Sequence, residues 1–162
     1  MRARIGSTLG AIALTAASVI GISSPASADS TYSSDECTSS GNARCFTLFY
    51  NSQSGAIWAS SCFIASGDIS DYTGYYAGGG VQVYFVFAYR SLTTNAAGYC
   101  DNSSGDGLPV KNNAAAGSNT MTSSYRVYYN SNYGGASQTF SPGTIANLNS
   151  TLKNENASGQ AL

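Results

Sequence analysis

The sequence predicts an all-β sandwich in which one structural unit is used twice. Residues 48–55 (LFYNSQSG) are echoed by residues 127–134 (VYYNSNYG), and residues 110–117 (VKNNAAAG) by residues 152–159 (LKNENASG). Two matches in the same order indicate a duplicated unit. Aromatic residues at alternate positions and frequent turn signals favour strands, and no segment makes a convincing long amphipathic helix.

Residues 1–28 have the pattern of a signal peptide. Arg2 and Arg4 give the positive start, residues 9–22 the apolar stretch, and residues 26–28 (Ala-Ser-Ala) a small-residue cleavage site. The apolar stretch is too short and too often interrupted for a membrane anchor. We therefore expect cleavage after Ala28 and a soluble protein secreted to the extracellular space.

The remaining chain is poor in charge. Removal of Arg2 and Arg4 leaves five basic against eight acidic side chains. Such a surface offers nucleic acid or an anionic membrane little to bind. The length suits one domain, and we expect a monomer without nucleic-acid or membrane partners.

All four cysteines, Cys37, Cys45, Cys62 and Cys100, follow the predicted signal peptide. An even number of cysteines in an exported chain favours disulfides over metal binding or redox chemistry. Three pairings are possible. We favour Cys37–Cys45, which closes a short polar loop, and Cys62–Cys100, which ties the ends of a long segment.

The first repeat is expected to span residues 45–120. Residues 29–44 form a polar lead, Ser-rich and mobile at its start, and residues 45–51 and 57–64 are predicted strands. Residues 68–80 are rich in Gly, Asp and Tyr and predict a loop. Residues 81–90 are the strongest predicted strand, because their apolar side chains alternate. The expected core face of that strand carries Val81, Val83, Phe85, Phe87 and Tyr89.

Residues 91–107 are rich in turn signals, and an insertion at about 67–105 enlarges the first repeat relative to the second. The second repeat, residues 121–162, begins with a predicted strand pair at 125–130 and 136–140. Ile145, Leu148 and Leu152 are spaced like a short helical turn. Pro142 and Gly143 nevertheless favour a connecting segment there.

These residues resemble the Greek-key motif of the βγ-crystallins. That motif has an aromatic residue, four residues, a second aromatic residue, one residue and then Gly. Tyr128, Tyr133 and Gly135 fit it in the second repeat, whereas the first repeat keeps Phe49 alone. The resemblance implies a βγ-crystallin-like Greek-key sandwich of two repeats, with a tight hairpin folded over each sheet.

More closely, the chain resembles secreted actinobacterial peptidase inhibitors of the metalloproteinase-inhibitor type, which share that fold. The signal peptide, the cysteine-containing lead, the Tyr-Tyr-Asn-Ser turn and the Lys-Asn-x-x-Ala endings carry the resemblance. It implies a secreted peptidase as the target. The best-known type of the family presents its scissile bond in a small disulfide loop between its halves. This chain has no cysteine after Cys100 and so has no equivalent loop.

The repeated endings suggest a weak calcium site, because βγ-crystallins can bind calcium through such loops. The candidate ligands are Asn112, Asn113, Asn154, Glu155 and Ser158. Calcium requires six to eight oxygen ligands, and each copy lacks hydroxyl ligands of the motif. The alternative is that these Asn side chains cap turns by bonding nearby backbone amides. We expect no other cofactor.

Catalysis is not expected, because the chain contains no His. Ser-His-Asp and Cys-His nucleophile activation and the usual zinc ligand sets are thereby excluded. Lys111 and Lys153 lie in the repeated endings and have a structural pattern. A carboxylate pair for glycoside cleavage would have to come from Gly-rich loops, where Asp usually shapes turns. The residues concerned are Asp68, Asp71, Asp101 and Asp106.

The leading hypothesis is therefore a secreted peptidase inhibitor that presents a rigid loop, either within residues 91–107 or between Cys37 and Cys45. The alternative is a non-catalytic binding or structural module of the cell wall or matrix. Exposed Tyr can anchor a protein or stack on a sugar. A third hypothesis, an antimicrobial toxin on the same fold, has no specific signal. The candidate partner-binding residues are Tyr72, Tyr75, Tyr76 and Tyr99.

Overall fold

The computed structural model describes residues 29–38, 44–54, 60–89, 100 and 102–162. The predicted signal peptide and Tyr99 lie outside these residues. The described residues form strands, and they include no helix that is long and apolar enough to cross a membrane. The strands are β1 (Asp29–Ser33), β2 (Asp35–Glu36), β3 (Phe46–Phe49), β4 (Cys62–Ala65), β5 (Gly74–Gly78), β6 (Val81–Phe85), β7 (Ala116–Asn119), β8 (Tyr125–Asn130), β9 (Gly134–Phe140), β10 (Ile145–Asn147) and β11 (Ser158–Ala161).

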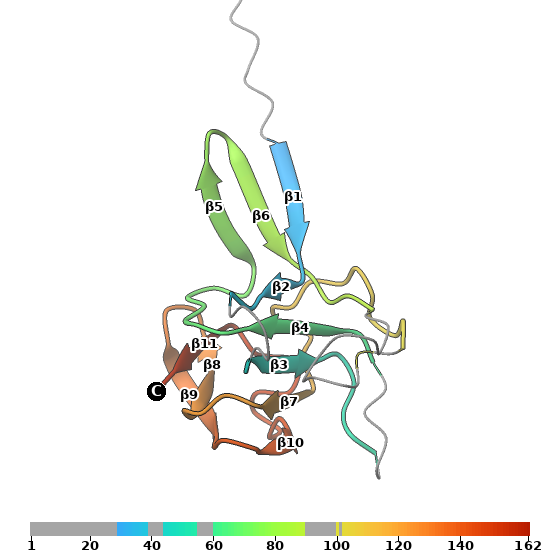
Figure 1. The fold of residues 1–162 in the computed structure, drawn as a ribbon, viewed down its shortest axis with the longest axis vertical. Helices are drawn as coiled ribbons and strands as arrows, with labels where there is room; N and C mark the ends of the chain where they lie inside the picture. Colours follow the sequence, from blue (N-terminus) through green and yellow to red (C-terminus); the bar gives the residue numbers. More distant parts are fainter. Residues whose placement is uncertain (1–28, 39–43, 55–59, 90–99, 101) are drawn as a thin grey trace, which may run out of the picture.

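Three sheets are formed by these strands. One has the order β10-β7-β3-β4-β2, the second β11-β8-β9, and the third β1-β6-β5. The first two make the body of the molecule, whereas β1, β6 and β5 project from it (Figure 1). The chain thus has a sandwich with a separate three-stranded extension.

The sequence echoes are structurally equivalent. Phe49 of β3 pairs with Ala116 of β7, and Tyr128 of β8 pairs with Ser158 of β11, at the positions that the echoes match. The Ala115 N–H donates to the Phe49 carbonyl, as the Ala157 N–H does to the Tyr128 carbonyl, both at 2.9 Å. One backbone pattern is therefore built twice.

Each repeat is a Greek key whose third strand joins the other sheet. In both repeats the fourth strand lies beside the first, giving the orders β7-β3-β4 and β11-β8-β9. The third strand of the second repeat, β10, pairs with β7. In the first repeat, Ile69 makes the corresponding bridge to Gly159 of β11. The predicted all-β Greek-key fold of two repeats is confirmed by this topology.

The core is centred on two aromatic rings at equivalent positions of the repeats. Phe46 of β3 and Tyr125 of β8 stack with centroids 4.2 Å apart and an interplanar angle of 13°. Phe140 meets Phe46 edge-on, with centroids 5.1 Å apart. All three side chains are buried. Such aromatic pairs contribute roughly 0.5–1.5 kcal/mol beyond the burial of their area.

Two glycines make room for these rings. A Cβ on Gly117 would lie 2.8 Å from Cζ of Phe46, and a Cβ on Gly159 would lie 2.6 Å from Cε1 of Tyr125. Gly117 and Gly159 end the two echoed segments. Neither has a positive φ, so the requirement is for space and not for backbone freedom. This explains the glycine that both copies share.

The residues that enlarge the first repeat lie between Tyr72 and Val110. The Tyr72 N–H donates to the Ala157 carbonyl as the Leu148 N–H does to the Ala115 carbonyl, which makes Tyr72 and Leu148 equivalent. In the second repeat, Leu148 is followed almost at once by the echoed segment, whereas β5 and β6 intervene in the first. The sequence placed this insertion slightly earlier, at about 67–105.

Several element predictions require correction. The lead is not a mobile tail, because β1 pairs in parallel with β6 and β2 with β4. The predicted loop at 68–80 contains β5, whose backbone pairs with β6 in spite of its glycines. Residues 145–147 form the strand β10 and no helical turn. The strong strand predicted at 81–90 ends at Phe85, and Tyr89 is exposed.

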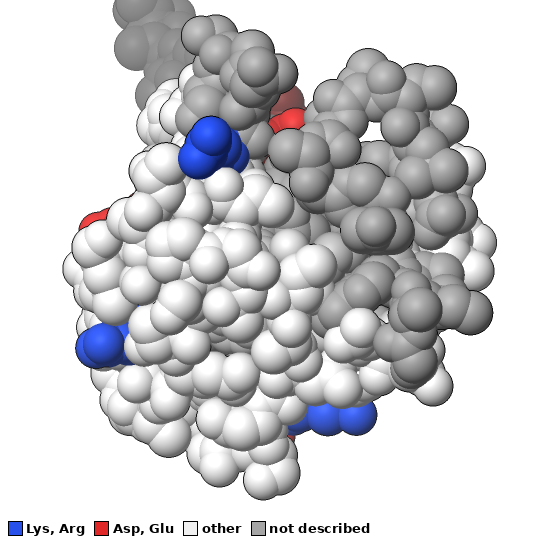
Figure 2. All heavy atoms as spheres, turned by 60° about the horizontal axis from the view of Figure 1, so that its bottom comes forward, with Lys and Arg blue, Asp and Glu red and all other residues white. Residues whose placement is uncertain are grey.

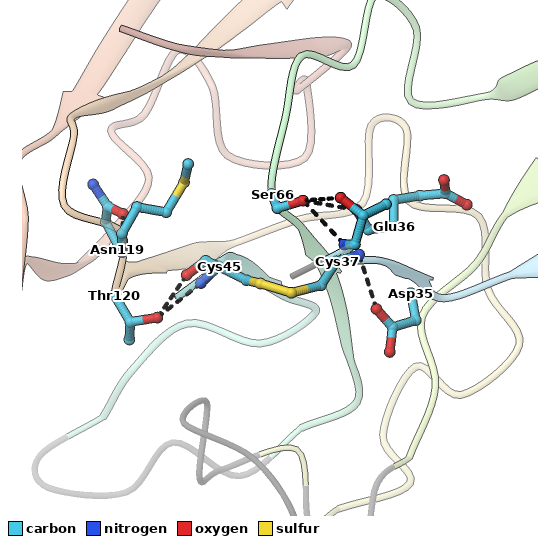
Figure 3. Close-up of a disulfide and its surroundings, with 9 residues drawn as sticks. Asp35, Glu36, Cys37, Cys45, Ser66, Asn119 and Thr120 are labelled. Carbon is cyan, nitrogen blue, oxygen red and sulfur yellow. Dashed lines mark hydrogen bonds between the residues drawn. A yellow bond between two sulfur atoms is a disulfide. The ribbon is translucent and has the colours of Figure 1, made fainter. Parts of the chain in front are cut away.

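The disulfides have the pairing favoured from the sequence. Cys37 and Cys45 are joined with their Cα atoms 6.1 Å apart, and Cys62 and Cys100 with theirs 5.4 Å apart. The first bond ties the end of β2 to the start of β3 (Figure 3). Thr120 holds Cys45 in place, because its hydroxyl donates to the Cys45 carbonyl at 2.8 Å. The Cys37 N–H donates to Asp35 at 2.9 Å.

Gly117→Ala and Gly159→Ala should each lower the free energy of unfolding by roughly 1–3 kcal/mol, because the added methyl forces the stacked rings apart. Gly67→Ala is the matched control, since nothing lies within 4 Å of its Cβ position. Urea unfolding with both disulfides intact measures the effect. An unfolding midpoint for Gly159→Ala equal to that of the control would contradict this account of the core.

Loss of the Cys62–Cys100 bond should cost more stability than loss of Cys37–Cys45. The sequence separations are 38 and 8 residues, for which loop entropy gives about 4 and about 2.5 kcal/mol. The double variants Cys62→Ala/Cys100→Ala and Cys37→Ala/Cys45→Ala can be compared by thermal unfolding. The reverse order of melting temperatures would show that entropy of the unfolded chain is not the main contribution.

Candidate functional site

The projecting sheet of β1, β6 and β5, which we name the aromatic sheet, carries exposed tyrosines on one face. Tyr32 is opposite Tyr84, and Tyr76 is opposite Gln82, so these side chains share that face. Tyr32 is 68% and Tyr76 64% exposed, and the rings of Tyr32 and Tyr84 lie 6.0 Å apart. Exposed aromatic rings at this density are typical of a binding surface.

The opposite face anchors the aromatic sheet to the body. Val83 and Phe85 of β6 are buried, and the ring of Phe85 lies 5.0 Å from that of Phe63 in β4. Tyr75 covers the other side of Phe85, with centroids 5.7 Å apart. Gly74 permits β5 to approach β6, because a Cβ there would collide with the Val83 carbonyl. Alternate side chains of β6 therefore point to two faces, one buried against the body and one that carries the exposed Tyr84.

A groove runs along the base of the aromatic sheet. It has a volume of about 450 Å³, and its lining includes Tyr32 and Tyr84 of the aromatic sheet as well as Pro109 and Lys111 of the body. Its lining is mostly apolar, with Thr73 and Lys111 among its few polar side chains. A predominantly apolar concavity with a few polar groups is the usual form of a ligand site.

The turn at 102–108 is fixed next to this groove. The Ser61 N–H and hydroxyl both donate to the Ser104 carbonyl, at 3.1 and 2.7 Å. The Gly107 N–H donates to the Phe87 carbonyl at 2.8 Å. These residues are the described part of the loop predicted to enter a peptidase, together with Cys100, which is buried and bonded to Cys62.

The structure separates the tyrosines that the sequence grouped. Tyr75 and Tyr76 are exposed on β5, and Tyr99 lies outside the described residues. Tyr72 is only 1% exposed and packs edge-on against Phe63, so it is not available to a partner, contrary to expectation. Burial, and secondarily the neighbouring Tyr125, raises the pKa of Tyr72. Tyr32 and Tyr84, which were not candidates, complete the surface instead.

Lys111 is part of a cluster that joins the two repeats. Its Nζ donates to both carboxylate oxygens of Asp71, at 3.1 and 3.0 Å, and to Ser131 Oγ at 2.9 Å. Ser131 Oγ in turn donates to Asp71 at 2.8 Å. Lys111 Nζ and Ser131 Oγ both donate hydrogen bonds to the Asp71 carboxylate, so Lys111 does not act as a base toward Ser131. The cluster fixes the turn after β8 to the first repeat.

The acidic residues considered for glycoside cleavage have structural partners. Asp71 accepts the Lys111 bonds, Asp106 accepts the Tyr89 N–H at 2.8 Å, and Asp68 accepts the Ala161 N–H at 2.9 Å. Asp101 lies outside the described residues. Charged side chains are sparse on the face shown in Figure 2. Asp68 and Asp71 line one pocket of about 230 Å³ together with Glu36, whose carboxylate accepts the Ser33 hydroxyl at 2.7 Å.

The predicted calcium ligands take part in the turns and hydrogen bonds of the repeated endings. Asn112 and Asn154 both have φ of 60°, a left-handed conformation that Asn tolerates at turns. The Ser158 hydroxyl donates to the Asn130 carbonyl at 2.7 Å and accepts the Tyr133 N–H at 3.0 Å. Asn113 donates to the Lys111 carbonyl at 3.2 Å.

Charge also opposes a cation at these endings. The Lys153 side chain lines the same pocket as Asn154. Glu155 is exposed and, within the described residues, no three His, Cys, Asp or Glu side chains gather as a metal site. Asn112 and Asn154 thus lie at turn positions with left-handed backbone, and calcium binding at these endings stays a prediction.

Asp71 should make stability depend on pH below about pH 4. Desolvation raises the pKa of this carboxyl, but hydrogen bonds from Thr73, Ser131 and Lys111 outweigh it and hold the pKa at about 2, below the usual 3.8. The stabilisation is thus complete above pH 4 and is lost as the pH falls through about 2. Asp71→Asn should be less stable than the parent at pH 5, with the difference shrinking toward pH 2. Denaturant unfolding at both pH values measures this, with Glu155→Gln as the exposed control.

Two solved structures resemble the chain in architecture. A βγ-crystallin from an archaeon is 14% identical, with a TM-score of 0.42 over 75% of this chain and 100% of that chain. Another, described as "Evolution of the eye lens beta-gamma-crystallin domain fold", is 11% identical, with a TM-score of 0.44 over 76% of this chain and 92% of that chain. No protein-family model and no curated protein matches the chain significantly. The likeness concerns architecture alone and says nothing of ligands or of the peptidase-inhibitor family expected from the sequence.

Proposed function

We propose that the protein is a secreted, non-catalytic binding module whose contact surface is the aromatic sheet. The observation that carries this proposal is the free tyrosine face of β1, β6 and β5 above buried Val83 and Phe85. A rigid aromatic surface loses little conformational entropy when it binds. The two disulfides suit an extracellular location, where such bonds persist.

The hydrogen bonding of the Lys111 cluster, within the described residues, supports binding over chemistry. The chain has no His, and Lys111 and Ser131 both direct their hydrogen bonds to Asp71. An activated nucleophile needs a base within hydrogen-bond reach whose lone pair is free. Lys111 lies within reach of Ser131 Oγ, at 2.9 Å, but its ammonium group donates to Asp71 and Ser131 and has no free lone pair.

A secreted peptidase is the partner that we propose first. The sequence resemblance suggests an inhibitor, and the fixed turn at 102–108 beside the groove supports a rigid surface that could block a peptidase cleft. Tyr is enriched among residues that dominate protein interfaces. In this proposal the aromatic sheet contributes affinity and the adjoining turn obstructs access.

A neutral polysaccharide of the cell wall is the second candidate. The neighbouring rings of Tyr32 and Tyr84 line an apolar groove whose lining includes few charges. Aromatic faces can stack on sugar rings without the need for charge. The specific observation for this candidate is therefore the paired rings along a groove.

Titration of the purified protein against a thermolysin-like metallopeptidase and a subtilisin-like serine peptidase tests the first candidate. We expect inhibition near stoichiometry, and Tyr76→Ala/Tyr84→Ala should weaken it at least about tenfold because both rings contribute to the contact. Tyr129→Ala is the matched control, since Tyr129 is 40% exposed on β8, outside the aromatic sheet.

Sedimentation with insoluble cell-wall polysaccharide tests the second candidate with the same variants. Polysaccharide binding that is lost in Tyr76→Ala/Tyr84→Ala, without peptidase inhibition, would favour the wall module. If the double variant and Tyr129→Ala behave alike toward both partners, the aromatic sheet is not the contact surface.

A further inference from the structure

The duplicated unit places a lysine and a serine at equivalent positions in both repeats. Lys111 and Lys153 match in the echoed endings, and Ser131 and Ser52 match in the echoed hairpin turns. The equivalence of Tyr72 and Leu148 makes their preceding residues, Asp71 and Asn147, equivalent as well. The two sets of residues thus differ at one position, which is Asp71 beside Lys111 and Ser131 and Asn147 in the other set.

In the first cluster a carboxylate is the common acceptor. The Asp71 carboxylate accepts hydrogen bonds from Lys111 Nζ at 3.1 and 3.0 Å and from Ser131 Oγ at 2.8 Å. Charge-assisted hydrogen bonds of this kind are about twice as strong as neutral ones. Lys111 of the first repeat and Ser131 of the second therefore bind a carboxylate together, and in this cluster the carboxylate is the chain's own Asp71.

In the second cluster the carboxylate is missing. Asn147 has a neutral amide, and that amide is bonded to the backbone of Gln53, which donates N–H to Oδ1 at 2.6 Å and accepts from Nδ2 at 3.3 Å. Lys153 is exposed and has no ion-pair partner among the described residues. Ser52 Oγ is buried without a hydrogen-bond partner.

These unsatisfied groups border an open pocket of about 540 Å³. Ser52, Lys153 and Asn154 contribute its polar groups, and Tyr50 and Ala115 contribute apolar surface. A buried hydroxyl without a hydrogen-bond partner is destabilising, and a ligand acceptor would satisfy it. The pocket therefore combines an unpaired cation, an unused donor and an aromatic wall.

We propose that this pocket binds the carboxylate of an external ligand. Lys153 and Ser52 would hold the ligand carboxylate as Lys111 and Ser131 hold Asp71, while the Tyr50 ring packs on the apolar part of the ligand. The chemical class is a small carboxylic acid or the terminal carboxylate of a peptide. The pocket does not include any residue of the aromatic sheet, so it is independent of the proposed function.

Amide chemical shifts of the full mature protein, recorded during titration with N-acetyl-phenylalanine, test the proposal. We expect saturable shifts at residues 50–54 and 153–154, and at least about tenfold weaker binding of the matching carboxamide. Acetate and a tripeptide with a free or an amidated terminus separate the two sources of the carboxylate. Equal binding of carboxylate and carboxamide, or no saturation by any carboxylate below about 10 mM, would overturn the proposal.

Three variants make the test specific. Asn147→Asp supplies an internal carboxylate beside Lys153 and should abolish ligand binding, and Lys153→Met should weaken it at least about tenfold. Lys111→Met, at the equivalent position of the first repeat, should leave ligand binding unchanged. Undiminished ligand binding by Lys153→Met would overturn the proposal. If Asn147→Asp does not fold, the binding measured for Lys153→Met is the test of the proposal.

Discussion

The stacking of Phe46 on Tyr125 is the contact on which the rest of the structure depends. The two rings come from the first strands of the two repeats and meet at the centre of the core. Their approach requires Gly117 and Gly159 on the strands that pair alongside. Because both repeats contribute a ring and a glycine, neither half can complete its core alone.

Exchange of the third strands adds a backbone connection to this side-chain contact. β10 pairs with β7 of the first repeat, and Ile69 pairs with Gly159 of the second. The backbone of the body is therefore fixed on both sides of the segment between Tyr72 and Val110. A segment whose two ends are held in this way can be lengthened without disturbing the core, since loop-closure entropy grows slowly with length. β5 and β6 of the aromatic sheet occupy that segment, and variation at such places often carries function.

The duplication and the core could be predicted from sequence because they depend on local patterns. The echoed segments have matched register in the structure, and the alternation of Val83 and Phe85 identified their buried face. β1 could not be found in the same way. Its polar residues pair through the backbone with β6, far along the chain, and leave no hydrophobic alternation.

The candidate site was predictable only in part. Composition drew attention to the tyrosines of residues 72–76 and correctly marked Tyr75 and Tyr76 as exposed, but it could not separate them from Tyr72. Tyr72 follows the Ile69 bridge as Leu148 follows β10, and that assignment needs the bridge to the other sheet. The groove likewise combines Tyr32, Tyr84 and Pro109, which only the tertiary structure brings together.

The parallel pairing of β1 with β6 has a consequence for the order in which the chain acquires its structure during synthesis. Asp29 aligns with Val81 and Ser33 with Phe85, so β1 has no partner until more than fifty later residues have emerged. Non-local parallel pairs form slowly, because the intervening chain must close first. Among the described strands, β1 is synthesised first and yet is among the last to pair, and its backbone edge stays open to other chains in the meantime.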